Sequence, residues 1–299
     1  FTAKQNQPYS NAKLFFFVSL ICLVCLGCQG EKPDKTLKIA VQGIISGSLS
    51  DNAELAVIGS VQHGGSLWNT ASAERQYNWN HRAGEFSSLR AAGISGNGKI
   101  AATAVNADIV IWNVNTGQSL NFWRAPDKIM AMVLDHRGQY AILGLQNNQA
   151  VYFDMQRGSA IYEFQHDAEV FGVSLSMNGE LAMTGSDDRT ARIWRLSDGA
   201  LLHKFEHRNQ VKTVALSPDG KLAFSAAQRE DAVVWDVVSG DAKAVLNFRY
   251  ENYTSARFTD DSANLLLGTF RGDVYRVNAQ NGEKIKHWTA KPRQLFGPA

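Results

Sequence analysis

The chain contains very few cysteines, and all of them lie near the N-terminus. Cys22, Cys25 and Cys28 are the only three among 299 residues. The region after Cys28 therefore has no disulfide and no free thiol, which excludes cysteine nucleophiles and cysteine-ligated metals there. This composition fits an exported domain, because stray thiols would be oxidised in an envelope compartment.

Acidic residues are absent from the first thirty positions, up to Glu31. Two lysines, Lys4 and Lys13, precede an apolar run over residues 14–26. A helix of that length spans about 20 Å, which is short of the roughly 30 Å hydrocarbon core of a bilayer. The pattern therefore predicts an export signal rather than a membrane-spanning helix.

The end of this signal, Leu26-Gly27-Cys28, resembles the lipobox of bacterial lipoproteins, although Cys25 stands where that motif usually has Leu. The resemblance implies a signal peptide over 1–27 and lipid attachment at Cys28. Several acyl chains on one residue would anchor the protein stably to a membrane. The alternative is that the three cysteines belong to an ordinary apolar helix.

The residues after the lipobox bear on location. Residues 28–35 form a polar tether, and Gln29 rather than Asp follows the Cys. By analogy with proteobacterial lipoproteins, Gln29 implies the outer membrane, with the protein facing the periplasm of a Gram-negative host. A mis-assigned start would instead leave the protein in the cytoplasm.

The chain also lacks an excess of charge of either sign. It has 30 Lys and Arg against 28 Asp and Glu, a net charge of +2. Removal of residues 1–27 deletes two lysines and no acid, which leaves 28 basic against 28 acidic residues. Because proteins that bind nucleic acid normally carry a clustered basic excess, we do not expect nucleic acid as a partner.

What the chain does contain is a repeat of about forty residues. Glycines recur at spacings of 41, 41, 41 and 42 residues, at Gly117, Gly158, Gly199, Gly240 and Gly282. A mostly aromatic anchor precedes each glycine by five residues and also occurs one unit earlier, at Trp68, Trp112, Phe153, Trp194, Trp235 and Val277. A second anchor follows each first anchor by eleven residues, at Trp79, Trp123, Phe164, Phe205, Leu246 and Trp288. Three independent landmarks share one register, so the fold is predicted to be a repeat array.

The best-defined unit runs from His166 to His207. Short apolar runs are separated by Asn178-Gly179 and Asp198-Gly199, which are typical turn dipeptides. The unit therefore reads as four antiparallel strands, which predicts an all-β fold in which each unit is one blade of a propeller.

The stretch 185–194 and the sequence 217–221 with Trp235-Asp236 resemble the turns and the third strand of the WD-repeat family of β-propellers. The resemblance covers roughly residues 36–299. It implies a structural hydrogen-bond tetrad in the fourth unit, formed by His166, Thr184, Asp188 and Trp194. The fifth unit keeps three of these positions, His207, Ser225 and Trp235, but has Arg229 where the family has Asp.

The number of blades depends on how the ring closes. The anchors define six complete units, and the alternating segment 36–41 precedes the first of them. Residues 294–296 fall where a further first strand would begin. Because an open array exposes sheet edges, we predict seven blades with an incomplete closing blade. A six-bladed ring that closes differently is the alternative.

Sequence features that suggest chemistry have simpler explanations. Residues 93–100 nearly match a phosphate-binding loop but lack the Ser or Thr that reaches Mg²⁺, and they align with a turn of the repeat. His81, His166 and His207 share one repeat position, so they belong to separate blades and a common metal site is not expected. Adjacent acids such as Asp187-Asp188 fall at predicted turns. We therefore expect no catalytic residues, no metal and no cofactor.

Function is then expected at the surface of the ring. In WD-repeat propellers, partners contact the loops before each first strand and between the second and third strands. Aromatic residues and arginine are enriched in interface hot spots, which selects Phe171, Arg229, Tyr253 and Phe270 as candidates. The predicted function is a monomeric, lipid-anchored scaffold for protein–protein interaction. The alternative is an enzyme or small-ligand binder that uses the central channel, as quinoprotein-type propellers do.

Overall fold

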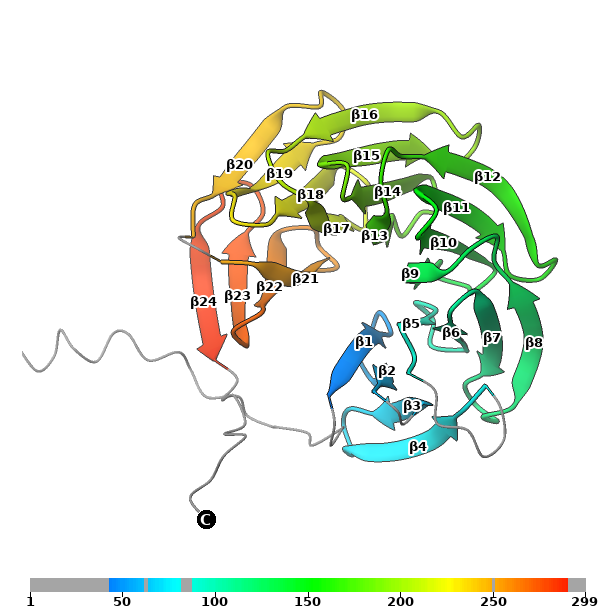
Figure 1. Cartoon of the computed structure of the whole chain (residues 1–299). Helices are drawn as coiled ribbons and strands as arrows, with labels where there is room; N and C mark the ends of the chain where they lie inside the picture. The colour runs from blue at the N-terminus through cyan, green and yellow to red at the C-terminus, as the bar shows by residue number, and fades with distance from the viewer. Residues whose placement is uncertain (1–42, 62–63, 82–87, 249–250, 290–299) are drawn as a thin grey trace, which may run out of the picture.

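The computed structural model describes residues 43–61, 64–81, 88–248 and 251–289, and every regular element in these ranges is a β-strand. The strands form six four-stranded antiparallel sheets, and each sheet is built from consecutive strands. The sheets lie around a central axis as the blades of a propeller (Figure 1). The prediction of an all-β propeller is therefore confirmed.

The blades are numbered in chain order. Blades one to three consist of β1 (Ile44–Leu49), β2 (Leu55–Ser60), β3 (Gly64–Asn69), β4 (Glu74–Trp79); β5 (Ala91–Ile94), β6 (Ile100–Val105), β7 (Asp108–Asn113), β8 (Ser119–Arg124); and β9 (Ile129–Leu134), β10 (Tyr140–Leu145), β11 (Gln149–Asp154), β12 (Ser159–Gln165). Blades four to six consist of β13 (Val170–Leu175), β14 (Leu181–Ser186), β15 (Thr190–Arg195), β16 (Leu201–Glu206); β17 (Val211–Leu216), β18 (Leu222–Ala227), β19 (Ala232–Asp236), β20 (Ala242–Leu246); and β21 (Tyr253–Phe258), β22 (Asn264–Thr269), β23 (Asp273–Asn278), β24 (Lys284–Thr289).

Local sequence explains the turns within a blade. In blade four the Ser176 hydroxyl lies 2.6 Å from Asn178 Oδ1 and accepts a hydrogen bond of 3.0 Å from the Leu181 amide. Gly179 follows with a φ of 71° and Gly199 closes the next hairpin with a φ of 73°. Only residues that tolerate positive φ fit these positions, which is why glycine recurs there at the period of the blade.

The core lies between neighbouring blades. The anchor on the outer strand of one blade stacks on the third-strand anchor of the next. The ring centroids are 5.2 Å apart for Trp79 and Trp112, 4.7 Å for Phe164 and Trp194, and 4.2 Å for Phe205 and Trp235. Burial of each such side chain contributes roughly 1.5 to 3 kcal/mol, so these stacked aromatic residues are core residues.

The prediction of seven blades is wrong for the residues that the structure describes. These residues form six blades, as in the stated alternative, because each repeat unit completes its own four-stranded sheet. The segments assigned to a closing blade, 36–41 and 294–296, lie outside the described residues.

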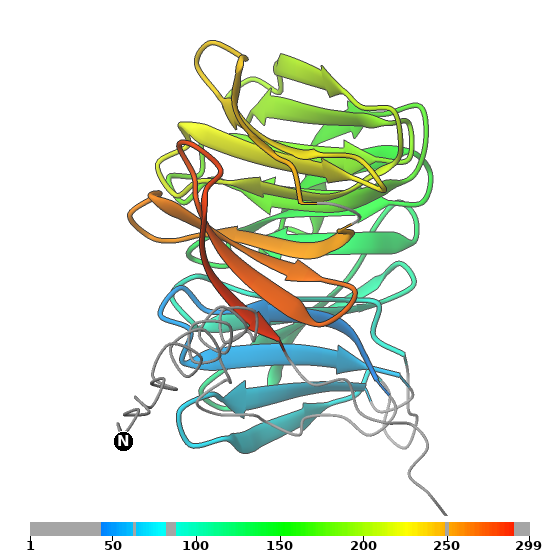
Figure 2. The same cartoon turned by 90° about the vertical axis from the view of Figure 1, so that its left-hand side faces the viewer.

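Blades six and one meet differently from the other neighbours. Five pairs of adjacent inner strands pack side by side, from β1 with β5 to β17 with β21. Between blades six and one, Arg257 of β21 donates hydrogen bonds to the carbonyl oxygens of Leu49 at 3.2 Å and Ser50 at 3.4 Å. Figure 2 looks onto this side, with blade six in orange and red above blade one in blue.

Candidate functional site

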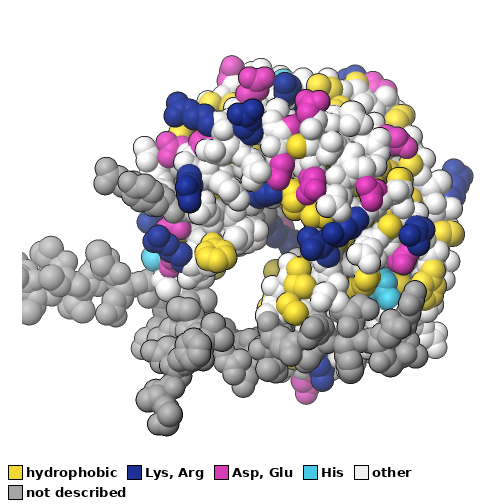
Figure 3. Space-filling view, viewed as in Figure 1, with side chains coloured by type: hydrophobic (Ala, Val, Ile, Leu, Met, Phe, Trp, Pro, Cys, Tyr) yellow, Lys and Arg dark blue, Asp and Glu magenta, His cyan; other side chains and the backbone are white. Residues whose placement is uncertain are grey.

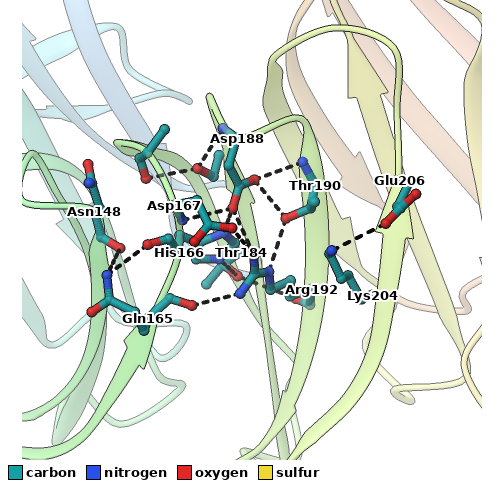
Figure 4. A network of polar contacts seen from close by, with 12 residues as sticks. Asn148, Gln165, His166, Asp167, Thr184, Asp188, Thr190, Arg192, Lys204 and Glu206 are labelled. Carbon is teal, nitrogen blue, oxygen red and sulfur yellow. Dashed lines mark hydrogen bonds and ion pairs between the residues drawn. The ribbon is translucent and has the colours of Figure 1, made fainter.

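The four predicted tetrad residues come together in blade four, and Figure 4 labels His166, Thr184 and Asp188 among them. His166 Nδ1 lies 2.9 Å from Asp188 Oδ2, and its Nε2 lies 2.8 Å from Thr184 Oγ1. Trp194 Nε1 donates to the same hydroxyl at 2.9 Å. An ionised carboxylate only accepts hydrogen bonds, so Nδ1 carries the proton and Nε2 accepts from Thr184. Burial lowers the pKa of His166, which favours this neutral form.

Asp188 is the centre of the network. Its side chain is almost completely buried, and it accepts hydrogen bonds from the Thr190 hydroxyl at 2.7 Å and from Arg192 Nη2 at 2.9 Å. Burial alone would raise the pKa of Asp188, but hydrogen bonds from His166, Thr190 and the Asp167 amide hold it well below its ordinary value. The network also reaches the preceding blade, because Arg192 Nη1 donates to the carbonyl oxygen of Gln165 at the end of β12 at 2.7 Å.

Blade five has a similar arrangement, but the residue that supplies its carboxylate was not predicted from the sequence. His207 Nε2 and Trp235 Nε1 each lie 2.8 Å from Ser225 Oγ. A carboxylate is supplied by Glu230, whose Oε1 lies 3.5 Å from His207 Nδ1, a charge contact without a hydrogen bond. Arg229 occupies the expected Asp position by number, but it takes the positive φ of the turn at 55° and its side chain is exposed. A search for any acid within one residue of the expected position would have found Glu230.

The histidines of the repeat act in separate blades. His81 Nε2 lies 3.1 Å from Thr103 Oγ1, to which Trp112 Nε1 donates at 2.8 Å, so blade two holds three members of the network. Burial lowers the pKa of both His81 and His207. Across residues 43–289, with the undescribed gaps left out, no group of three or more His, Cys, Asp or Glu is arranged to hold a metal ion.

The turns between second and third strands join the loops that precede the inner strands. The Asp187 amide donates to Glu169 O at 3.0 Å in blade four, and the Phe270 amide donates to Asn252 O at 3.1 Å in blade six. Both types of loop therefore lie on one face of the ring, which we call the loop face.

The surface charge of the molecule is mixed. Acidic and basic side chains are interspersed over the surface seen in Figure 3.

Two of the candidate contact residues are exposed together on the loop face. Phe270 is 83% exposed, and Arg229 is exposed on the neighbouring blade. Asn252 connects their loops, because its side chain accepts from the Arg229 amide at 3.1 Å while its carbonyl accepts from the Phe270 amide. Aromatic residues and arginine are both enriched in protein interfaces, so these two exposed side chains on joined loops are the stronger candidates.

The other two candidates behave differently. Phe171 is partly buried beneath Lys212, whose Nζ lies 3.2 Å from the ring centroid and also pairs with Asp187. The prediction that Tyr253 is a surface contact is wrong, because it is 6% exposed and packs edge-on against Phe224 at 6.0 Å. Tyr253 opens its inner strand, and this position faces the preceding blade.

A surface hollow of about 320 Å³ lies away from these candidates, on the outside of blade two. Its lining residues include Phe122, Trp123 and the exposed ion pair between Arg124 and Asp108, 3.1 Å apart.

The predicted lipid attachment site, Cys28, lies outside the described residues. In the part of the chain that the structure describes, no helix has the length and apolar character needed to cross a membrane.

Comparison with known families identifies the repeat. Residues 158–195 and 199–236 match the model of the WD domain, G-beta repeat. Each match covers the fourth strand of one blade and the first three strands of the next, β12 to β15 and β16 to β19, which is the expected register of a WD repeat. None of the curated proteins matches the chain. Together the sheets and the two matches identify an all-β propeller with WD40 repeats.

Proposed function

We propose that this β-propeller with WD40 repeats is a non-catalytic scaffold that binds other proteins through its loop face, while a lipid at Cys28 holds it to the bacterial cell envelope. The observation that carries the binding function is the exposed pair of Phe270 and Arg229. An apolar ring exposed to this extent gains free energy when a partner covers it, and the guanidinium beside it supplies directed hydrogen bonds.

The absence of catalysis is also part of the proposal. Where the candidate residues are most polar, in blade four, each group already has a partner inside the protein. Repeat proteins of this shape offer a rigid ring of loops, and such loops are where partners bind.

A matched pair of variants tests the binding face. Phe270→Ala removes the ring from the loop face, and Val238→Ala removes an equally exposed side chain, 84% exposed, from the turn between the third and fourth strands of blade five. Envelope proteins that co-purify with the wild type and with Val238→Ala but not with Phe270→Ala would support the proposal. Identical recovery with both variants would contradict it.

The anchor requires a separate experiment. We propose that the mature protein begins at an acylated Cys28 and faces the periplasm from the outer membrane, on the strength of Leu26-Gly27-Cys28 and the following Gln29. Mass spectrometry of the mature N-terminus, with fractionation of wild type and Cys28→Ser, measures this directly. An acylated Cys28 in the membrane fraction, lost in the variant, is the expected result. An unprocessed chain in the cytosol would contradict the anchor and leave the scaffold proposal standing.

A further inference from the structure

Four exposed arginines lie on the loop face of blades four to six, and we call them the arginine arc. They are Arg189, Arg208, Arg229 and Arg271. None of their guanidinium groups has an ion-pair or hydrogen-bond partner among the residues that the structure describes. The arc is therefore a set of cations that the fold itself leaves available.

Contacts between blades four and five hold the first part of the arc in place. The carbonyl oxygen of Arg189 accepts a hydrogen bond of 2.9 Å from the His207 amide. The amide of the next residue, Arg208, donates to Glu230 Oε2 at 2.9 Å, and Glu230 follows Arg229 in its turn. These bonds use backbone groups of the arginines and leave their guanidinium groups to solvent.

The link between blades five and six is of the same kind. The Asn252 side chain accepts from the Arg229 amide, and the Asn252 carbonyl oxygen accepts from the Phe270 amide, both at 3.1 Å. Arg271 follows Phe270 in that turn. The loops of the arc therefore form one connected series. A partner would meet the guanidinium groups on a backbone that is already ordered, which reduces the entropic cost of binding.

Turn geometry does not explain the arginines. From blade two to blade six, each turn between the second and third strands has one residue with positive φ, namely Asn106 at 53°, Asn148 at 70°, Arg189 at 68°, Arg229 at 55° and Gly272 at 86°. Asn and Gly adopt this conformation more readily than arginine does. The arginines of blades four and five therefore contribute nothing that the turn itself needs.

Most carboxylates of the same loops already have a partner. Those with a partner within the chain are Glu169, Asp187, Asp188, Glu230 and Glu251. Two further acids, Asp167 and Asp231, are exposed. On this part of the loop face the cations are therefore open to a partner, whereas most of the acids are not.

We propose that the arginine arc binds an acidic segment of a partner protein, whose carboxylates pair with the guanidinium groups while an apolar side chain covers Phe270. The proposal names the partner of the loop face, so it rests on the proposed scaffold function. A guanidinium pairs with a carboxylate through two parallel hydrogen bonds. Because the four cations are spread over three blades, they match a segment with acids along its length rather than one small anion.

The two exposed acids favour a protein over a nucleic acid as the partner. A nucleic-acid backbone carries a phosphate at every unit, so it would place negative charges against Asp167 and Asp231. A protein segment can carry neutral or basic residues at those points. Phe270 is 83% exposed, and an apolar side chain of the same segment would remove its ring from water.

Binding of a fluorescent hexaglutamate peptide to the full-length protein, measured by anisotropy, tests the arc directly. We expect Arg229→Gln to weaken binding about fivefold, as loss of one exposed ion pair implies. The matched control is Arg137→Gln, which should leave the affinity unchanged. Arg137 is also an exposed turn residue, but it lies between the first and second strands of blade three, at the opposite face of the ring.

Three results of this measurement would overturn the proposal. They are equal affinities of the two variants, no binding of hexaglutamate to the wild type, and tighter binding of hexathymidylate than of hexaglutamate. The last result would assign the arc to phosphate groups instead of carboxylates.

Co-purification from the envelope separates this proposal from the scaffold function. Partners that are lost with Phe270→Ala and Arg229→Gln but recovered with Arg137→Gln would support both. Partners that are lost with Phe270→Ala and fully recovered with Arg229→Gln would overturn the acidic segment and leave the scaffold function standing.

Discussion

Blades four and six have the same strand order and register but different interiors. Blade four holds the full polar tetrad, whereas blade six has Leu267 and Val277 at the positions of Thr184 and Trp194. Blade six nevertheless forms the same four-stranded sheet, with both residues buried. The pattern of apolar residues along the strands and the residues of the turns are therefore sufficient to specify a blade. The tetrad adds local stability to a sheet that is already specified.

The two blades also differ in how they are covered. Blade four lies between two neighbours, and its aromatic anchor is buried in a stack. Among the residues that the structure describes, blade six is covered in this way on one face only. Because hydrophobic stabilisation scales with the area removed from water, the same residue type contributes less at the junction of blades six and one than in the middle of the array.

The largest expected effect is at the blade four anchor. Trp194→Ala should lower the free energy of unfolding by about 3 to 5 kcal/mol, because it removes a buried indole and the hydrogen bond to Thr184. Val277→Ala, at the equivalent position in blade six, should cost less because it removes fewer atoms and no hydrogen bond. Urea titration of both variants measures the difference. Equal losses of unfolding free energy in the two variants would show that the hydrogen bond to Thr184 adds no stability beyond burial of the anchor side chain.

Removal of the tetrad carboxylate should have the next largest effect. Asp188→Ala leaves His166 and Arg192 without their buried partner, which should cost about 3 kcal/mol. Asp273→Ala is the control in blade six, where the carboxylate pairs with the partly exposed His287 at 2.9 Å and should contribute about 1 kcal/mol or less. Thermal unfolding of the two variants gives the ranking, and a larger loss for Asp273→Ala would reverse the comparison.

Acidification should weaken the tetrad in two stages. Burial lowers the pKa of His166, so below about pH 6.5 the unfolded chain takes up a proton that the fold does not, and stability falls. The pKa of Asp188 is also lowered, so its contribution is present above about pH 4 and is lost as the pH falls further. The melting temperature as a function of pH measures both stages. A His166→Gln variant that keeps the full loss between pH 7 and 5 would exclude His166 as a cause of the first stage.

The smallest expected effect is at the junction of blades six and one. Trp288→Ala should lower stability by about 1 kcal/mol or less, because the indole is partly exposed and has no aromatic partner among the described residues. Phe205→Ala, at the equivalent buried position of blade four, should cost about 3 to 5 kcal/mol.

The period of the glycines predicted the blades correctly because each hairpin needs a residue with positive φ, and Gly117, Gly158, Gly199, Gly240 and Gly282 all have it. The four tetrad residues also came together as the resemblance implied. Glu230 was missed because a shift of the turn by one residue moves the carboxylate without changing the repeat spacing. Tyr253 was misplaced because strand position, rather than residue type, decides which side chain faces the neighbouring blade.

The different junction between blades six and one could not be predicted from local patterns. Ile44 and Val170 read as the same apolar position at the start of an inner strand, and only the arrangement of the blades shows that one is exposed and the other buried. Blade six has Arg276 at the position that Ile193 occupies in blade four, and this difference is visible in the sequence. Only the structure shows which face of β23 points toward blade one.

The consecutive pairing of strands within each sheet bears on how the protein folds. Every sheet forms from strands that follow one another along the chain, so a blade can assemble from a short stretch soon after it is synthesised or exported. The hydrogen bonds from Arg257 to Leu49 and Ser50 are the opposite case, because they join residues more than two hundred positions apart. We therefore expect the blades to form in order from the N-terminus, with the junction of blades six and one established last.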